Sequence, residues 1–136
     1  MDNYSQEIQN IQKRNQTLLD EFRGALENAN LATKTVKTHI ENIDFFSIFL
    51  IRYLPLSKLD ETQPVDVQRF LAEWYPNKTT WASPYNTKSY MSSFRKFFKF
   101  LRENGKFDIE VENEIKKMLK ENKKIFLDAV DFGDDW

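Results

Sequence analysis

The chain is 136 residues long, carries a formal net charge of −1 and contains no cysteine. This length fits one domain. The absence of cysteine excludes disulfides and thiolate zinc sites. No apolar run approaches the roughly 20 residues of a membrane helix, and the polar N-terminus does not have the apolar centre of a signal peptide, so we expect a cytoplasmic protein with no membrane partner. Three Gly and four Pro beside 12 Phe favour long helices around an aromatic core.

Apolar residues at helical spacings predict a first helix over residues 2–28. They are Ile8, Ile11, Leu18, Leu19, Phe22 and Leu26. Residues 1–15 hold few of these anchors, so we expect them to form an N-terminal arm that frays or stands apart. A second helix is predicted over residues 33–53, with Ala32 or Thr33 at its cap and Pro55 ending it. Its second half is apolar nearly all round, which is typical of a buried central helix.

Proline, glycine and hydroxyl residues mark the later elements. Residues 56–63 are expected to connect to a short helix that starts at Pro64 and ends at residues 75–77, followed by a loop over residues 78–82. Ser83 and Pro84 predict the start of a fourth helix, and Gly105 its end. Asp108 is expected to cap a fifth helix that runs to about Val130. We therefore predict an all-α fold, a single bundle of four to five helices over residues 16–127 with a solvated acidic tail over residues 128–136.

Residues that could build a catalytic centre are few. The only histidine is His39, which favours a packing role over a metal site. Gly-rich phosphate loops and the common nucleophile and zinc motifs do not occur. Glu110, Glu112 and Glu114 could in principle pair in a carboxylate-only hydrolase, although a solvated helix face explains them more simply. We therefore predict a binding protein and not an enzyme, with no metal, no cofactor and no small-molecule substrate.

The predicted fourth helix has an apolar side and a basic side. The apolar side comprises Tyr90, Phe94, Phe97, Phe98 and Leu101, and the basic stripe comprises Lys88, Ser92, Arg95, Lys99 and Arg102. Residues 84–106 hold six Lys or Arg and one Glu, a local net charge of +5 in a chain of net charge −1. Cations beside hydroxyl groups at a helix start are suited to a phosphate backbone. The alternative interpretation is a solvated face that happens to be basic.

The start of the second predicted helix repeats this combination of cations and hydroxyls. Lys34, Thr35 and Lys37 lie in its first turns, between Thr33 and Thr38. A helix amino end carries a partial positive charge, which favours anions there. This segment is therefore a second candidate for contact with phosphates.

Four segments between Leu18 and Ile115 share their order and spacing with a known family. They are Leu31-Ala32-Thr33-Lys34-Thr35 at the end of the first helix, the aliphatic and aromatic helix from Val36 to Leu54, the segment Gln63-Pro64-Val65-Asp66-Val67-Gln68-Arg69-Phe70-Leu71, and Met91-Ser92-Ser93-Phe94-Arg95-Lys96-Phe97-Phe98-Lys99-Phe100-Leu101 with Gly105 beyond it. In this respect the chain resembles the core-binding, SAM-like domain of tyrosine recombinases and phage integrases. The last segment is the most specific of the four.

The resemblance implies a helical bundle that clasps duplex DNA, acting in DNA integration and recombination. The implied contact residues are Lys34, Thr35 and Lys37 at the start of the second helix and Asn86, Lys88, Arg95 and Lys99 in the fourth. The family's catalytic domain, with its Arg, Lys, His-x-x-Arg and nucleophilic Tyr, has no counterpart in this sequence. Conversely, the acidic tail of this sequence has no counterpart in the family. Ala32 replaces the usual Ser cap. Strand cleavage is therefore not implied.

Two functions remain open from the sequence. The first is a DNA-binding module, as an integrase relic, a truncated regulator or the binding part of a longer recombinase. The second is a protein-interaction module or homodimer that uses the acidic tail and exposed aromatic residues, a type enriched at interfaces. The candidate aromatic residues are Trp74, Tyr75, Trp81, Tyr85 and Trp136.

Overall fold

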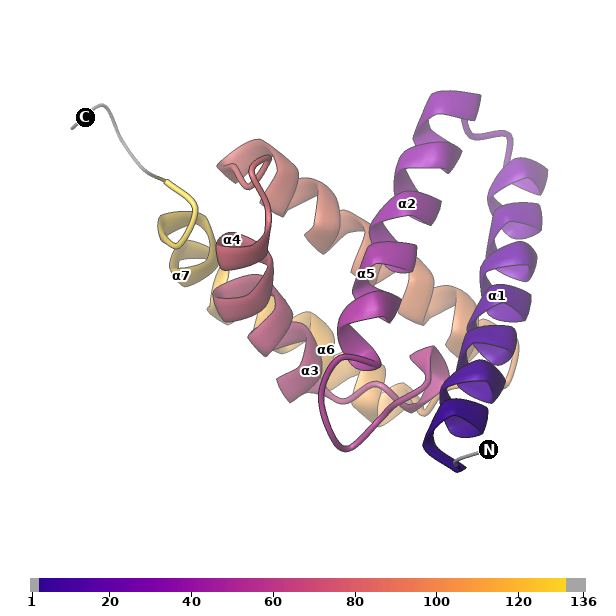
Figure 1. Ribbon diagram of the computed structural model, residues 1–136. Helices are drawn as coiled ribbons and strands as arrows, with labels where there is room; N and C mark the ends of the chain where they lie inside the picture. Colours follow the sequence, from indigo (N-terminus) through magenta and orange to yellow (C-terminus); the bar gives the residue numbers. More distant parts are fainter. Residues whose placement is uncertain (1–2, 132–136) are drawn as a thin grey trace. The chain divides into compact units, whose positions relative to one another are not determined.

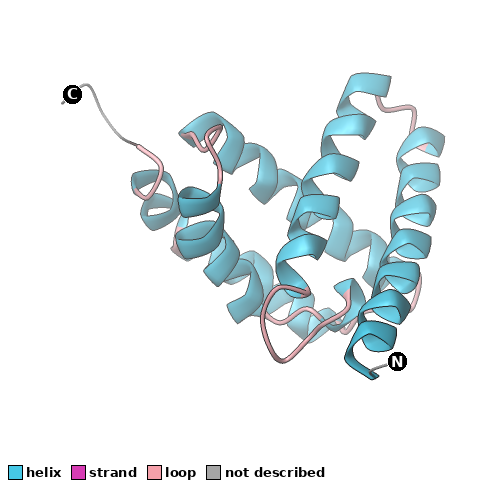
Figure 2. Cartoon of the chain, in the orientation of Figure 1, coloured by secondary structure: helices cyan, strands magenta, loops and turns pink. Residues whose placement is uncertain are grey.

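The computed structural model describes residues 3–131, and every regular element in this range is helical (Figure 1). In chain order the elements are α1 (Asn3–Asn28), α2 (Thr33–Leu50), the 3-10 turn η1 (Leu59–Glu61), α3 (Pro64–Arg69), the π-helical turn η2 (Phe70–Trp74), α4 (Tyr75–Lys78), α5 (Pro84–Glu103), α6 (Ile109–Glu121) and α7 (Lys123–Asp128). Figure 2 shows these helices joined by loops, with no strand among the described residues. The predicted all-α class is confirmed.

The chain divides between Thr62 and Gln63 into two compact units. The first contains α1, α2 and η1, and the second contains α3 to α7. No helix of the described residues is both long enough and apolar enough to cross a membrane. Of the acidic tail predicted over residues 128–136, residues 132–136 lie outside the described residues. The earlier part is not a solvated tail, because Asp128 belongs to the last helix and Val130 is 1% exposed.

In the first unit α1 and α2 lie side by side and are joined by a short turn (Figure 1). Asn30 has a φ of 61°, and asparagine accepts this left-handed conformation better than most residues. The N–H of Leu31 reaches back to the carbonyl of Leu26 at 3.3 Å, which satisfies one carbonyl at the end of α1. The buried apolar residues of the two helices are Ile11, Leu18, Leu19, Phe22 and Leu26 on α1 and Val36, Ile40, Ile43, Phe46, Phe49 and Leu50 on α2.

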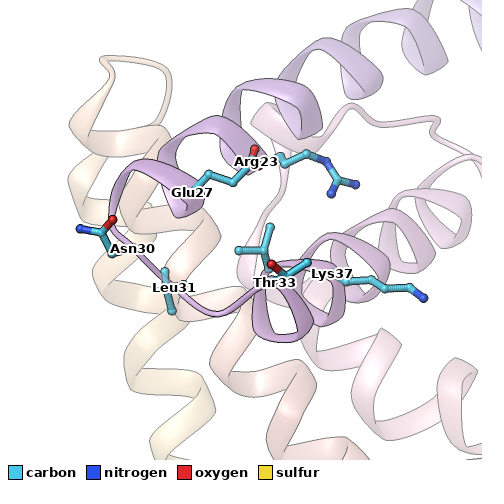
Figure 3. A pocket seen from close by; sticks show the side chains of 7 residues that line it. Arg23, Glu27, Asn30, Leu31, Thr33 and Lys37 are labelled. Carbon is cyan, nitrogen blue, oxygen red and sulfur yellow. The ribbon is translucent and has the colours of Figure 1, made fainter.

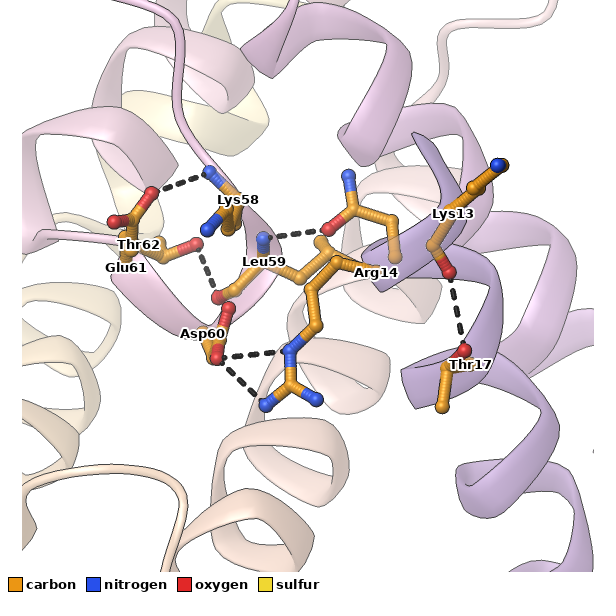
Figure 4. Close-up of polar contacts among 9 residues, drawn as sticks. Lys13, Arg14, Thr17, Lys58, Leu59, Asp60, Glu61 and Thr62 are labelled. Carbon is orange, nitrogen blue, oxygen red and sulfur yellow. Dashed lines mark hydrogen bonds and ion pairs between the residues drawn. The ribbon is translucent and has the colours of Figure 1, made fainter. Parts of the chain in front are cut away.

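The expected N-terminal arm, residues 1–15, belongs to α1, which is continuous from Asn3. Within that stretch Ile11 and Asn15 are buried. The side-chain carbonyl of Asn15 accepts a hydrogen bond from the N–H of Leu59 at 2.9 Å, and Arg14 forms an ion pair with Asp60 at 2.9 Å (Figure 4). These contacts fasten η1 to α1, because they satisfy a buried donor and a charged side chain at the same point.

Helix α2 ends at Leu50, three residues before the predicted end at Tyr53. Beyond Leu50 the N–H groups of Ile51 and Arg52 bond to the carbonyls of Ile48 and Phe49, three residues back, at 3.2 and 3.1 Å. The last turn therefore tightens as in a 3-10 helix and ends α2 earlier than Pro55 alone predicts.

The helix that was predicted to end at residues 75–77 continues through η2 and α4 to Lys78. The N–H of Tyr75 bonds to the carbonyl of Phe70, five residues back instead of four. This wider turn is a π-bulge. The wider turn directly precedes Pro76, which has no N–H to donate to that turn.

The single fifth helix that the sequence predicted is two helices, α6 and α7, that meet at Asn122. The side-chain amide of Asn122 donates to the carbonyl of Met118 at 2.9 Å. Asparagine side chains compete in this way with the backbone bonds of a helix, which favours a break. Ile115, Leu119 and Phe126 are buried, and Val111 and Met118 are half-buried.

The second unit has an aromatic core that α5 supplies in large part. The apolar side predicted for this helix is buried, with Tyr90, Phe94, Phe97, Phe98 and Leu101 each at most 5% exposed. The ring of Phe70 meets Tyr90 and Phe94 edge-on, at centroid distances of 5.3 and 5.8 Å. Edge-to-face pairs of this kind add to the free energy gained by burial. Because one face of α5 packs in this core, its opposite face is exposed to solvent.

Candidate functional site

Helix α5 begins as its sequence predicts. Ser83 is the N-cap, and its hydroxyl accepts a hydrogen bond from the N–H of Asn86 at 3.1 Å, while Pro84 occupies the first turn. The helix ends at Glu103, and Gly105 beyond it has the left-handed φ of 69°. With both ends fixed and one face buried, the orientation of the opposite face is determined.

That opposite face carries four exposed cations and a hydroxyl, which we call the α5 basic face. Its residues are Lys88, Ser92, Arg95, Lys96 and Lys99, all of them exposed. Ser92 follows Lys88 by four residues, Arg95 and Lys96 follow Ser92 by three and four, and Lys99 follows these two by four and three, so they are neighbours on the helix surface. From Lys88 to Lys99 the face extends over about 16 Å of helix.

The four cations of the α5 basic face have no carboxylate partner among the described residues, whereas several cations elsewhere do. Lys37 pairs with Glu41, Arg69 with Glu73, Lys117 with Glu121 and Lys124 with Asp128, each four residues apart on one helix. Such pairs stabilise a helix slightly. Lys88, Arg95, Lys96 and Lys99 lack this compensation within residues 3–131, so their charges face solvent unopposed.

Arg102, which the stripe included, has a different role from its neighbours. Its Nε donates to the Oε1 of Glu112 at 2.7 Å, and the Glu112 side chain is 1% exposed. Lys116 approaches the other oxygen of Glu112 at 2.9 Å, as an ion pair without hydrogen-bond alignment. Arg102 therefore neutralises a buried carboxylate and links α5 to α6. Its charge is less available to a ligand than the charge of the exposed Lys99.

The pKa of Glu112 results from two opposed effects. Burial raises it, because a charged carboxylate loses its hydration. The hydrogen bond from Arg102 and the nearby ammonium of Lys116 act the other way and leave the pKa of Glu112 below its ordinary value. The hydrogen bond to Glu112 likewise raises the pKa of Arg102. Both groups are therefore charged near neutral pH.

Asn86, another predicted contact residue, is committed to the start of α5. Its side-chain amide donates to the carbonyl of Trp81 at 2.6 Å. The indole Nε1 of Trp81 in turn lies 3.4 Å from the hydroxyl of Tyr90. Asn86 thus ties the preceding loop to the helix, and a nucleic-acid contact would have to use its remaining polar atoms.

The predicted contact residues at the start of α2 form a surface of the first unit. Lys34 and Lys37 are exposed, and Thr35 is half-buried. Ala32 is the N-cap and supplies no side-chain hydrogen bond, so the amino end of α2 lacks the usual side-chain cap. Lys37 lies 3.7 Å from Glu41, which partly offsets its charge.

A hollow of about 470 Å³ lies beside this helix start (Figure 3). Its walls come from α1, α2 and the turn between them: Arg23, Glu27, Asn30, Leu31, Thr33, Val36 and Lys37. In Figure 3 the side chains of Arg23 and Lys37 extend toward the same side, while Glu27 brings a carboxylate to the same wall. The hollow is therefore mixed in charge, in contrast to the α5 basic face.

The aromatic residues that the sequence proposed for a partner surface are divided between core and surface. Tyr75 is fully buried and Trp74 is half-buried against Phe70, at a centroid distance of 5.9 Å. Trp81 and Tyr85 are 49% and 82% exposed. Trp136 lies outside the described residues.

One residue of the α5 basic face is absent from the predicted stripe. Lys96 entered the sequence analysis only through the local charge, although it follows Ser92 by four residues and is therefore its neighbour on the helix surface.

Within residues 3–131 no three acidic, histidine or cysteine side chains gather in a way that could hold a metal ion. His39 is buried. Comparison of the chain with models of known protein families, with curated proteins and with solved structures found no match.

Proposed function

We propose that this chain is a non-catalytic, cytoplasmic DNA-binding module whose α5 basic face contacts the phosphates of duplex DNA. The observation that carries the proposal is a set of four exposed cations on one helix face without a carboxylate among the described residues to neutralise them. Phosphate contacts supply most of the affinity of many DNA-binding proteins and need this arrangement of Lys, Arg and hydroxyl groups.

The spacing of the cations supports the same proposal. Arg95 and Lys99 are four residues apart, and Lys96 and Lys99 are three apart, so their like charges repel along the helix. In the free protein this repulsion is unfavourable. A row of phosphates would remove it, which makes an anionic polymer a better counterpart than a single small anion.

The resemblance of the chain to the core-binding, SAM-like domain of tyrosine recombinases also supports the proposal. That family's pattern ends in the α5 segment, which includes Arg95 and Lys99. We assign the start of α2, with Lys34, Thr35 and Lys37, as a second and weaker contact surface, because Glu41 offsets part of its charge.

A salt titration of duplex binding tests the proposal. Fluorescence anisotropy with a labelled duplex of about 20 base pairs should show affinity that falls steeply between about 50 and 200 mM salt. Replacing Lys88, Arg95 and Lys99 together by Ala should weaken binding and lower the salt slope by about two to three, roughly one for each phosphate that the variant no longer neutralises.

The matched control replaces Lys117, Lys120 and Lys124 by Ala, which removes the same charge from α6 and α7. This control should keep the affinity and the slope of the wild type. Absence of duplex binding at micromolar protein in low salt would overturn the proposal, as would equal losses in the two triple variants, since equal losses would mean that only total charge matters.

A further inference from the structure

Tyr85 is the most exposed large apolar or aromatic side chain among the described residues. It is the second residue of α5 and is 82% exposed. Its ring makes no hydrogen bond or ring contact with another residue in the range 3–131, whereas Trp81, the nearest exposed ring in sequence, bonds through its indole to Tyr90. The fold therefore explains the position of Trp81 and leaves that of Tyr85 without a structural reason.

The position of Tyr85 on the helix extends the α5 basic face. Tyr85 precedes Lys88 by three residues and Ser92 by seven, so it stands at one end of the row that continues to Lys99. Over these residues the helix rises by about 21 Å, which matches about six nucleotides at the 3.4 Å spacing of a duplex strand. One flat ring at the end of a row of cations is the combination that binds single-stranded nucleic acid, where bases stack on aromatic side chains and cations follow the backbone.

We propose that Tyr85 stacks on an unpaired base, so that the α5 basic face binds DNA with a single-stranded extension more tightly than blunt duplex. The inference rests on the proposed DNA-binding function and adds a preference for unpaired bases. A paired base inside a duplex offers no free face to the ring, whereas an extension does. A membrane surface fits less well, because interfacial helices insert a broad apolar face and the α5 basic face has one ring among four cations and a serine.

The experiment compares three labelled DNAs at one salt concentration: a blunt duplex, the same duplex with a six-nucleotide extension, and the extension strand alone. The wild type should bind the extended duplex about tenfold more tightly than the blunt one, the effect expected of one stacked base. Tyr85→Ala should remove this advantage and keep the blunt-duplex affinity and salt slope, while Tyr85→Phe should keep the advantage because it keeps the ring. Tyr4→Ala, which removes a 49% exposed ring from α1, serves as the control.

A measurement on the unaltered protein complements the variants. With 5-iodouracil in the extension, ultraviolet cross-linking followed by peptide mapping should place the cross-link on the peptide that contains Tyr85. Equal affinity of the wild type for blunt and extended duplex would overturn this inference and leave the proposed function intact, whereas no binding to any DNA would overturn both. Loss of a wild-type dimer in Tyr85→Ala, seen by light scattering, would assign the ring to a protein contact and also overturn the inference.

Discussion

Glu112 links the pH dependence of stability to one buried side chain. The carboxylate is 1% exposed and is held by Arg102 and Lys116, and its pKa in the folded protein lies below the ordinary value of 4.5. A group whose pKa is lowered by folding stabilises the fold above its unfolded-state pKa, and this contribution is lost as the pH falls through the folded-state pKa. We therefore expect the thermal midpoint to fall as the pH is lowered from about 5 toward 3, beyond what the other carboxylates cause.

Glu112→Gln provides the comparison that isolates this side chain. The amide keeps the size of the side chain and cannot titrate, so the variant should be less stable than the wild type at pH 7, and the difference should shrink as the pH falls. Circular dichroism melts at intervals of half a pH unit measure both. A difference between the two proteins that stays constant from pH 7 to pH 3 would contradict the assigned ionisation.

Residue-scale partners are the part of the molecule that the sequence could not predict. The helical spacing placed Arg102 in the basic stripe correctly, but its partner Glu112 belongs to another helix, and nothing in the spacing distinguishes a cation that meets a buried carboxylate from one that meets water. In the same way the buried amide of Asn15 bonds to Leu59, 44 residues later. Residues 1–15 hold few apolar anchors, which favours a loose arm when the sequence is considered alone. The contact that holds this part of α1 in place comes from Leu59, which the local sequence does not indicate.

At the scale of the element, the two faces of α5 should respond oppositely to mutation. Arg95→Ala with Lys99→Ala removes two repelling charges and no contact within the fold, so the free energy of unfolding should stay within about 0.5 kcal/mol of the wild type or rise slightly. Arg102→Ala should lower it, because the carboxylate of Glu112 then stays buried with Lys116 as its remaining cation. Urea unfolding followed by circular dichroism gives both values.

The contrast within α5 also separates the two interpretations of its basic stripe. A face that was selected for stability should lose stability when its cations are removed, and a binding face should lose affinity instead. A drop of more than about 1 kcal/mol in the Arg95 and Lys99 variant would be evidence for a structural role, since exposed substitutions without such a role usually change stability by about 0.5 kcal/mol or less.

Element boundaries were predictable wherever a local cap or stop decides them. Ser83, Pro84 and Gly105 act within one turn, and the limits of α5 follow from them. The π-bulge of η2 and the break at Asn122 were missed because each depends on particular hydrogen bonds, from Tyr75 to Phe70 and from Asn122 to Met118, that the spacing of apolar residues does not specify. Pro76 alone predicts a helix end, and only the shifted bond from Tyr75 to Phe70 shows how the helix continues.

At the scale of the whole molecule, charge is distributed unevenly. Residues 84–106 carry +5, so the rest of the chain carries −6 to give the total of −1. At pH 7.5 the protein is above its isoelectric point of about 5.9, and a uniform distribution of charge would prevent retention on a polyanion. Local charge governs encounter with a polyanion at short range, because salt screens more distant charges within about 8 to 10 Å.

We therefore expect the protein to bind immobilised heparin at pH 7.5 and low salt and to elute as the salt rises. The variant that replaces Lys88, Arg95 and Lys99 by Ala has a net charge of −4 and should pass through the column. The variant that replaces Lys117, Lys120 and Lys124 by Ala has the same net charge of −4 and should be retained like the wild type, because its α5 basic face is intact. Passage of both variants would mean that net charge and not its position decides binding, and would remove the unopposed charge of α5 as the basis for DNA recognition.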